Sequence, residues 1–216
     1  LDRPEVVIVR PEPADREAIL RVHDERYVNL IFRLSEQSRP YDWETPCSPE
    51  ILEALLYIIG GVLAVGSRVV EGEVEKGVGL GGGFHHAARD RGGGFCLFND
   101  VAILVEHLRA RYGLKRIMIV DHDVHAGDGT SDIFYADPGV LFVSIHQDPR
   151  TIYPGTGFIH QVGEGPGQGY NVNIPLPPGT GDDSYMRVLE EIVAPLAHEF
   201  KPEILISNGG SDPHFM

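Results

Sequence analysis

The amino-acid sequence predicts an α/β protein built in three layers, with a mainly parallel sheet between two layers of helices. Two observations support this fold class. Continuous apolar runs, typical of parallel strands buried on both faces, occur at residues 116–121, 140–146 and 204–207. Helical patterns precede the first and the last of these runs, as expected for connected α and β units. With 216 residues, the chain suits a single domain over 1–216.

The N-terminal third predicts a short edge strand and two helical stretches. Residues 6–9 form a β-branched run before two prolines, which indicates a strand that leaves into a turn. Apolar residues recur at helical spacing over 14–34, with an interruption expected at 23–27. Ser48, which precedes a proline, predicts a helix start, and residues 51–70 supply a mostly apolar helix that we expect to be buried on several faces.

Two further helices are expected, over 99–112, closing at Gly113, and over 182–200. The Gly-heavy passage at 77–94 is too specific in composition for a linker. Each of the three apolar strands ends in polar residues. In open parallel sheets the functional crevice lies beyond the carboxyl ends of the strands, so these polar ends should gather in one place.

The amino-acid composition indicates which kinds of binding partner are expected and which are not. The formal net charge of −14 argues against tight binding to nucleic acid or to an anionic membrane surface, and it modestly favours a cationic substrate. The longest apolar runs fall short of a membrane span, and we find no signal peptide. With only Cys47 and Cys96, reduced thiols are the simplest interpretation. We therefore expect a cytoplasmic protein without nucleic-acid or membrane partners.

The densest cluster of reactive side chains follows the strand at 116–121. Residues 121–129 hold three acids and two histidines. Asp123 and His125 lie two residues apart, so an extended segment would place both side chains on one face, where they can share a divalent ion. Asp121 would point the same way from a deeper position. A solvated turn with local hydrogen bonds is the alternative for this segment.

Asp212 follows the last predicted strand and would add a carboxylate to the same crevice. Two carboxylates and one histidine leave an open coordination position. Oxygen and nitrogen ligands without a thiolate suit a catalytic Zn²⁺, with Fe²⁺ or Co²⁺ as alternatives, because structural zinc sites are typically closed and rich in cysteine.

His85 and His86 are adjacent within the Gly-heavy passage, whose glycines allow the backbone to approach a ligand closely. Adjacent histidines can supply a general base and a general acid when carboxylates orient them, and Asp121 and Asp128 are candidates for that role. Two ordinary loop histidines are the alternative, which the acid-rich strand end makes the weaker one.

These motifs resemble the histone deacetylase superfamily, which includes acetylpolyamine amidohydrolases and acetoin-utilisation proteins. The Gly-x-Asp-x-His pattern at 210–214 is more similar to the bacterial and class II branches. The resemblance implies an arginase-like α/β/α fold. Five motifs occur in order, with spacing similar to that of the family, at 81–87, 93–100, 121–130, 143–146 and 153–157.

The resemblance also implies a role for each reactive residue. His85 would pair with Asp121, and His86 would pair with Asp128 as the general base. The resemblance further implies a tunnel for acyl-lysine with aromatic walls, and such walls suit an extended alkyl chain. The zinc ligands would be Asp123, His125 and Asp212. The substrate contacts would be Gly94, Phe95 and Tyr153, with Asp42 as a rim acid. A structural K⁺ ion would be bound by side chains or carbonyls of Asp121, Ser144 and Ile145.

The chain departs from the family pattern in several places. Ala126 stands where the family usually has a second histidine, and His122 stands at a position more often apolar or aromatic, although neither change removes a ligand. The family also carries a tyrosine after its aspartate ligand that hydrogen-bonds the substrate carbonyl. The sequence has no tyrosine between Asp212 and Met216, so we expect a longer natural polypeptide, with a genuinely shortened relative as the alternative. Without that donor, we expect the rate to be ~10²–10³-fold lower.

We therefore predict a metal-dependent amidohydrolase that removes the acetyl group from acetyl-lysine or an acetylpolyamine by attack of water. The alternative is a family member that binds metal but is catalytically weak or inactive and acts as a binding or scaffold module, which Ala126 and the missing tyrosine favour. A hydrolase with two Mn²⁺ ions is disfavoured because it needs a second set of bridging acids.

Overall fold

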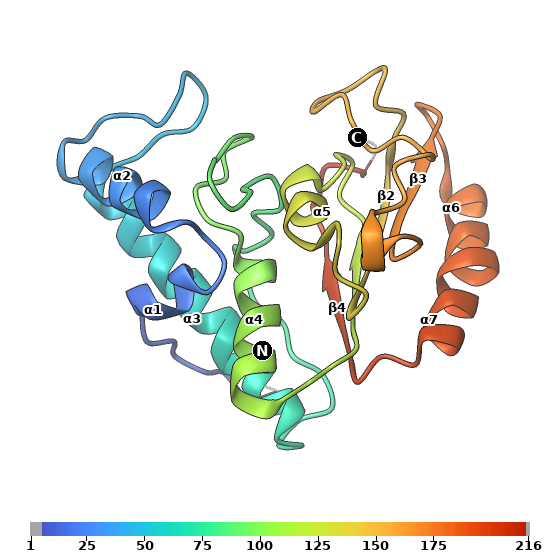
Figure 1. Ribbon diagram of the computed structural model, residues 1–216, viewed down its shortest axis with the longest axis horizontal. Helices are drawn as coiled ribbons and strands as arrows, with labels where there is room; N and C mark the ends of the chain where they lie inside the picture. Colours follow the sequence, from blue (N-terminus) through green and yellow to red (C-terminus); the bar gives the residue numbers. More distant parts are fainter. Residues whose placement is uncertain (1–5, 215–216) are drawn as a thin grey trace.

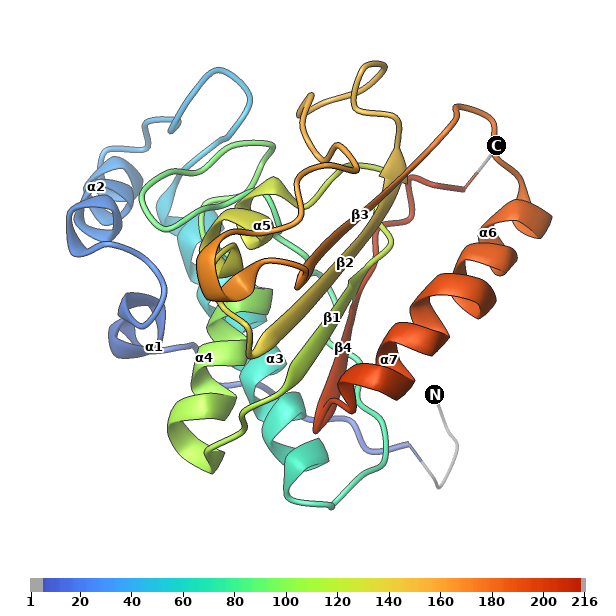
Figure 2. The same cartoon turned by 45° about the vertical axis from the view of Figure 1, so that its right-hand side comes forward.

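Four parallel strands form the sheet in the computed structural model, which describes residues 6–214 (Figures 1 and 2). In order across the sheet they are β3 (Asn171–Leu176), β2 (Val140–Gln147), β1 (Ile117–Asp121) and β4 (Ile204–Asn208). The register places Asp121 opposite Ser144 on one side and Asn208 on the other. The carboxyl ends of β1, β2 and β4 therefore lie at the same end of the sheet.

Helices cover both faces of this sheet (Figure 2). One face carries α4 (Asp100–Tyr112) and α5 (Asp128–Phe134), and beyond them α3 (Pro49–Val70), α1 (Arg16–Leu20) and α2 (Glu25–Glu36). The other face carries α6 (Asp182–Val188), the π turn η2 (Leu189–Val193) and α7 (Ala194–Phe200). A short 3₁₀ turn, η1 (Gly165–Gly167), precedes β3. The predicted three-layer α/β/α fold with a parallel sheet is confirmed.

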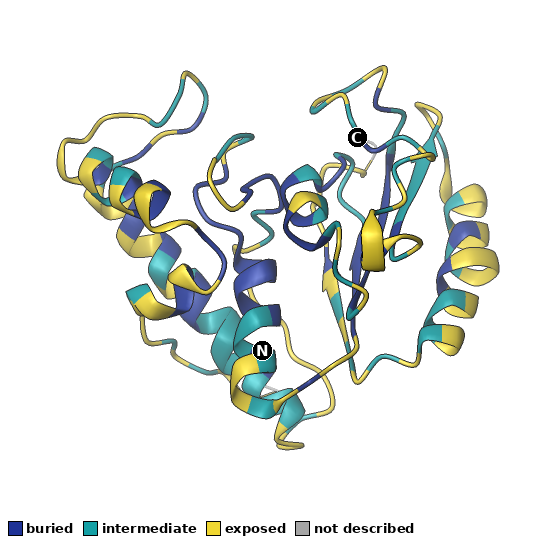
Figure 3. Cartoon of the chain, viewed as in Figure 1, coloured by how far each residue is buried: buried dark blue, intermediate teal, exposed yellow. Residues whose placement is uncertain are grey.

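Side chains of β1 enter two cores, one on each face of the sheet. Ile117 and Ile119 pack with the helices around α4, whereas Met118 and Val120 pack against α6 and α7. Every residue of β1 is buried, as predicted for a strand covered on both faces (Figure 3). The carboxyl end of β1, which carries Asp121, thus lies between two packed layers.

Capping residues account for the helix boundaries that the sequence predicts. Ser48 accepts a hydrogen bond from the backbone of α3, and Asn99 does the same for α4. Gly113 ends α4 with a left-handed φ of 73°. The expected interruption within 14–34 is the break between α1 and α2, and the helix over 182–200 is present with η2 in its middle.

One expectation about local structure is wrong, and the sequence analysis does not predict two elements that the structure contains. Residues 6–9 form no strand in the described part of the chain, and Val7 and Ile8 are exposed there. β3 was not predicted because it lacks an apolar run and contains Pro175, which is tolerated because β3 is an edge strand. The helix α5 was not predicted either, since the Asp and Gly residues at its start are typical of a turn.

The helix α3 also differs from expectation. Most of its residues are half-buried or exposed, so it is not buried on several faces. By length and composition it could cross a membrane, so the expectation that no apolar stretch reaches that length is wrong. Core helices of globular proteins meet the same criterion, and α3 packs on α4 with Gly66 directly against Leu104. Its buried residues are Leu52, Leu55, Ile59, Gly60 and Gly66.

Candidate metal centre and histidine pair

Three ligand side chains converge where β1 and β4 end. Asp123 and His125 lie in the segment that follows β1, and Asp212 lies in the segment that follows β4. His125 Nδ1 is 3.0 Å from Asp123 Oδ1 and 3.1 Å from Asp212 Oδ2. One ligand atom from each residue lies within 4.8 Å of the other two. The parallel pairing of β1 with β4 therefore brings together residues that are distant in sequence.

The donor set fits a zinc ion. Zinc binds imidazole nitrogen and carboxylate oxygen at ~2.0–2.2 Å in a tetrahedron, whose ligand atoms are then roughly 3.3–3.5 Å apart, close to the separations around His125. Three protein ligands leave a fourth position for a reactant, as in catalytic zinc sites. Cys47 and Cys96 are free and buried and do not belong to this group. Iron or cobalt would accept the same oxygen and nitrogen donors.

The charges at this group suit a cation. Burial raises the pKa of Asp123, but the hydrogen bonds from His125 and the charge on His85 outweigh it and lower that pKa to about 2. The hydrogen bond to Asp123 in turn raises the pKa of His125. A divalent ion would therefore compete with the proton that His125 holds between two carboxylates.

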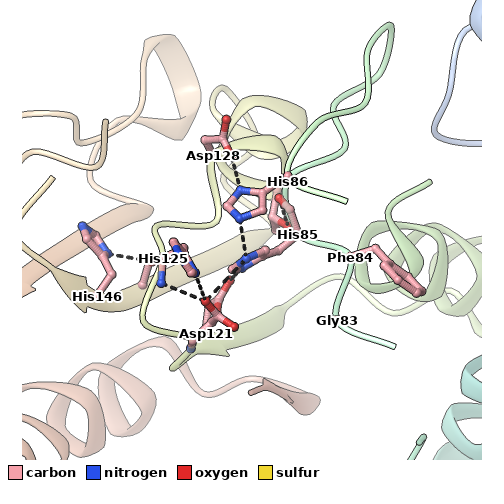
Figure 4. Close-up of polar contacts among 12 residues, drawn as sticks. Gly83, Phe84, His85, His86, Asp121, His125, Asp128 and His146 are labelled. Carbon is pink, nitrogen blue, oxygen red and sulfur yellow. Dashed lines mark hydrogen bonds and ion pairs between the residues drawn. The ribbon is translucent and has the colours of Figure 1, made fainter. Parts of the chain in front are cut away.

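His85 and His86 lie side by side, and each is backed by a carboxylate from a different element (Figure 4). His85 Nδ1 is 2.7 Å from Asp121 Oδ2 at the end of β1, and His86 Nδ1 is 2.6 Å from Asp128 Oδ1 at the start of α5. The Nε2 atoms of the two rings are 3.1 Å apart. His85 Nε2 is also 3.8 Å from Asp123 Oδ1, which places the histidine pair directly beside the metal ligands.

The two rings differ in their electrostatic surroundings. Burial alone would lower the pKa of His85, but the Asp121 carboxylate outweighs it and raises that pKa to about 9. Burial lowers the pKa of His86, Asp128 opposes this, and the charge on His85 lowers it further. At neutral pH the extra proton of the pair therefore resides on His85, and His86 is neutral.

The backbone around the pair is held by residues to which the sequence analysis assigned no role. Thr130 N donates a hydrogen bond to the carbonyl of His85, and Asn99 Nδ2 donates one to the carbonyl of Ala87, both at 3.0 Å. Gly129 lies so close that an added Cβ would be 2.5 Å from the carbonyl oxygen of Ala87. The first turns of α4 and α5 thus rest on the pair's backbone. The only signal in the sequence was their place within the motifs at 93–100 and 121–130.

His23 belongs to the same buried support. Its Nδ1 is 2.8 Å from the carbonyl oxygen of Ala88, and Asn99 N donates to its Nε2 at 3.0 Å. Because a backbone N–H can only donate, Nε2 carries no proton and the neutral ring holds its proton on Nδ1. Burial lowers the pKa of His23 to about 4.

We expect His23 to make the free energy of unfolding depend on pH between 6.5 and about 4. The unfolded chain takes up this proton below pH 6.5, whereas the folded protein does so only near pH 4, so acidification favours unfolding by up to about 3 kcal/mol. The contribution is complete above pH 6.5. Urea unfolding across this range should show a shallower dependence for His23→Gln, while exposed His198→Gln should match the wild type. Equal slopes for all three proteins would contradict the prediction.

Two of the predicted substrate contacts, Gly94 and Tyr153, lie beside His86. Tyr153 packs edge-on against the His86 ring, with centroids 4.9 Å apart, and is 44% exposed. Gly94 lies against both rings, since an added Cβ would be 2.5 Å from His86 Cδ2 and 3.0 Å from Tyr153 Cε1. Phe95, next along the chain, is 70% exposed. Tyr153 thus provides a partly exposed aromatic face beside His86, and the position of Phe95 as a second wall stays a prediction.

Asp42 is placed differently. Its Oδ1 accepts hydrogen bonds from Glu44 N at 3.0 Å and from Thr45 N at 2.7 Å, so this oxygen stabilises its own turn. The preceding Tyr41 packs edge-on against Tyr27 of α2, with ring centroids 5.8 Å apart, which anchors the loop. The role of Asp42 as a rim acid stays a prediction and would use its other oxygen.

Gly94→Ala should destabilise the protein beyond the cost of its backbone conformation. Gly94 has a left-handed φ of 51°, where alanine costs about 1–2 kcal/mol, and the new Cβ would also displace His86 or Tyr153. Gly72→Ala is the matched control, because Gly72 has φ 73° and nothing within 4 Å of an added Cβ. In paired urea titrations we expect Gly94→Ala to lose at least about 1 kcal/mol more than Gly72→Ala. Equal losses in the free energy of unfolding would show that the rings of His86 and Tyr153 move aside without a measurable cost.

The residues expected to bind K⁺ lie at the neighbouring end of β2. Ser144 is paired with Asp121 in the sheet, and Ile145 follows it. Ser144 Oγ is 2.9 Å from His146 Nδ1, and His146 Nε2 is 2.8 Å from the carbonyl oxygen of Gly157. The hydroxyl of Ser144 therefore already has a partner in His146, and binding of K⁺ stays a prediction.

Comparison with known proteins identifies the family. A model of the histone deacetylase domain matches residues 1–216. A probable deacetylase of Archaeoglobus fulgidus is 42% identical over 214 residues, which cover 97% of this chain and 58% of that protein. The acetoin utilization protein AcuC of Bacillus subtilis is 35% identical over 217 residues, which cover 96% and 56%. The chain belongs to the histone deacetylase family, and its resemblance to prokaryotic members is confirmed.

Solved structures agree with this family. An HDAC homolog from Aquifex aeolicus has a TM-score of 0.85 at 32% identity, over 92% of this chain and 56% of that chain. The structure of an HDAC homolog complexed with SAHA gives the same values. The arginase-like fold that the motifs implied is thus confirmed. The chain spans 56–58% of the length of these relatives.

Proposed function

We propose that this protein is a zinc-dependent deacetylase that hydrolyses the amide of an N-acetylated amine, acetyl-lysine or an acetylpolyamine. The observation that carries the proposal is the juxtaposition of three metal-type ligands with a histidine pair in which each ring is backed by a carboxylate. His85 Nε2 lies 3.8 Å from Asp123 Oδ1. Membership of the histone deacetylase family and relatives named as deacetylases support this reaction class.

A divalent ion held by Asp123, His125 and Asp212 would act as a Lewis acid on the acetyl carbonyl and acidify the attacking water. His86 would accept a proton from that water. Asp128 binds Nδ1 of His86 and so keeps the lone pair of the ring on Nε2, where a proton can be taken up.

His85 would supply the proton that the departing amine needs. Asp121 holds its Nδ1 and stabilises the protonated ring. His86 is neutral before it takes the proton from water, and once His85 has protonated the amine, His86 would pass that proton to His85 across the 3.1 Å between the two Nε2 atoms. Tyr153, with Phe95 next to Gly94, would flank the alkyl chain of the substrate and exclude water from the amide. The residues thus divide into a base, an acid and a hydrophobic wall.

The net charge of the chain supports one class of substrate, and its two cysteine thiols support one cellular compartment. The formal net charge of −14 supports a substrate with a cationic amine or basic neighbours. Cys47 and Cys96 are both free, and burial raises the pKa of Cys96 to about 12, which keeps it a protonated thiol. These features support a cytoplasmic location, which stays a prediction.

The test combines metal content, by mass spectrometry of the purified protein, with hydrolysis of a fluorogenic acetyl-lysine peptide and of an acetylpolyamine, each with and without a chelator. We expect one zinc per chain and turnover of at least one substrate that the chelator abolishes and added zinc restores. Turnover that persists in the metal-free protein would contradict a metal-dependent mechanism. Zinc binding without hydrolysis of either substrate would support the alternative of a metal-binding module.

A further inference from the structure

We propose that Asp100, the first residue of α4, is a positioning residue that holds the backbone leading into His85 and His86. No step of the proposed hydrolysis uses this carboxylate, although it is among the most deeply buried charged groups, with 2% of its surface exposed. Its effect on turnover rests on the proposed function. Its effect on the geometry of the histidine pair does not.

The carboxylate of Asp100 binds the two amides that immediately precede the pair. Phe84 N donates to Oδ1 at 2.8 Å, and Gly83 N lies 3.1 Å from Oδ1 and 3.0 Å from Oδ2. Figure 4 shows Gly83 and Phe84 running directly into His85. Thr130 N binds the carbonyl of His85 from the other side. The segment is therefore clamped between α4 and α5.

The charge of Asp100 is held by backbone amides. Burial raises the pKa of Asp100, and the N–H groups of Phe84 and Gly83, together with those at the start of α4, oppose that rise. A buried carboxylate that receives several N–H donors makes short, charge-assisted hydrogen bonds, about twice as strong as neutral ones. The position at the first turn of a helix adds a favourable dipole.

The local sequence makes room for this clamp. An added Cβ on Gly82 would be 2.2 Å from Asp100 Oδ2, so only a glycine allows the carboxylate to lie against the backbone there. Gly83 has a positive φ of 99°, which turns its N–H and the next one toward the same carboxylate. Gly82, Gly83 and Asp100 thus form one device, with its parts in two separate motifs.

Loss of the clamp should affect the histidines and spare the metal ligands. Asp123, His125 and Asp212 lie beyond β1 and β4, whereas the carboxylate of Asp100 is hydrogen-bonded to Gly83 and Phe84. A misplacement of ~1 Å in a catalytic group costs up to ~10²-fold in rate. Impaired positioning should therefore lower kcat while KM and zinc content hold.

The decisive comparison is Asp100→Asn against Asp182→Asn. Asp182 is the first residue of α6, so its substitution removes the same charge at the same helix position without touching the histidine segment. In Asp100→Asn the side-chain NH₂ would replace the oxygen that accepts from Gly83 N, so two hydrogen-bond donors would face each other and that bond would be lost. We expect loss or broadening of the low-field NMR signals of the ring N–H protons that His85 and His86 share with Asp121 and Asp128. We expect kcat to fall ~10–100-fold, with KM changed by less than about twofold and zinc content unchanged.

Gly82→Ala tests the same device with Asp100 left in the chain. Its Cβ should displace the carboxylate and reproduce both effects, whereas Gly61→Ala in α3, whose Cβ would meet Pro11 at an ordinary 3.5 Å, should not. If Asp100→Asn does not fold, Gly82→Ala decides. Wild-type ring signals and kcat in a folded variant, or a lower melting temperature with wild-type ring signals, would overturn the proposal. If neither the wild type nor any variant hydrolyses either substrate, the proposed function fails, while the NMR signals still decide the role of Asp100.

Discussion

Asp123→Ala should leave the protein without its zinc and without hydrolysis. Asp123 is one of the three metal ligands that we propose among the described residues, and its Oδ1 also orients His125 through the ring Nδ1 at 3.0 Å and the backbone N at 2.8 Å. Its removal therefore weakens a second ligand. Changes in groups that merely support ligands cost ~10–100-fold in metal affinity, so loss of a ligand should exceed ~10²-fold. Metal content after dialysis, measured with turnover on the same sample, gives both results.

The matched control for this prediction is Asp183→Ala. Asp183 is exposed in the first turn of α6, and its substitution removes the same charge at a residue that belongs neither to the candidate metal ligands nor to the histidine pair. We expect this variant to retain wild-type zinc and turnover. If Asp123→Ala kept one zinc per chain, the assignment of the metal ligands would be wrong, whatever its activity.

His86→Ala should keep its zinc and still lose most of its turnover. The His86 ring contacts His85, Asp128 and Tyr153, and it lies outside the group of metal ligands. General base catalysis typically contributes ~10²–10⁴-fold, so kcat should fall by that factor. Steady-state kinetics at saturating zinc, with metal content measured in parallel, separates the loss of a base from the loss of the ion.

Two comparisons sharpen this result. His160→Ala removes an exposed histidine that stacks on Phe158, and it should leave kcat unchanged. Because His85 and His86 act as a unit, the double variant should lose little more than the worse single variant. Full turnover in His86→Ala would show that another group takes the proton.

Much of the fold could be predicted because its signals are local. The apolar run of β1 predicts a strand buried on both faces, and Ser48, Asn99 and Gly113 mark helix ends by short-range hydrogen bonds and φ preferences. β3 gave no such signal, because it contains Pro175 and is defined by its pairing with β2. Residues 6–9 show the converse, since a β-branched run forms no strand without a neighbour to pair with.

The candidate site divides in the same way. Asp123 and His125 could be predicted to share one face because they are two residues apart in an extended segment. Asp212 could be placed near them only on the assumption of parallel neighbouring strands, which the register of β1 and β4 bears out. The role of Asp100 could not be predicted from the sequence, because its hydrogen-bond partners, Gly83 and Phe84, lie in a different motif.

By itself, the sequence determined the fold class, the family, the boundaries of α3 and α4 and the chemical types of the reactive side chains, because short-range sequence patterns carry each of these. The resemblance to the family already implied which carboxylate pairs with which histidine, and the structure shows both pairs. Only the tertiary structure decided how closely Asp212 approaches His125 and which buried groups hold the histidine pair in place. Those relations depend on how strands and helices that are distant in the chain pack together, and distance and desolvation then set the pKa of each ring.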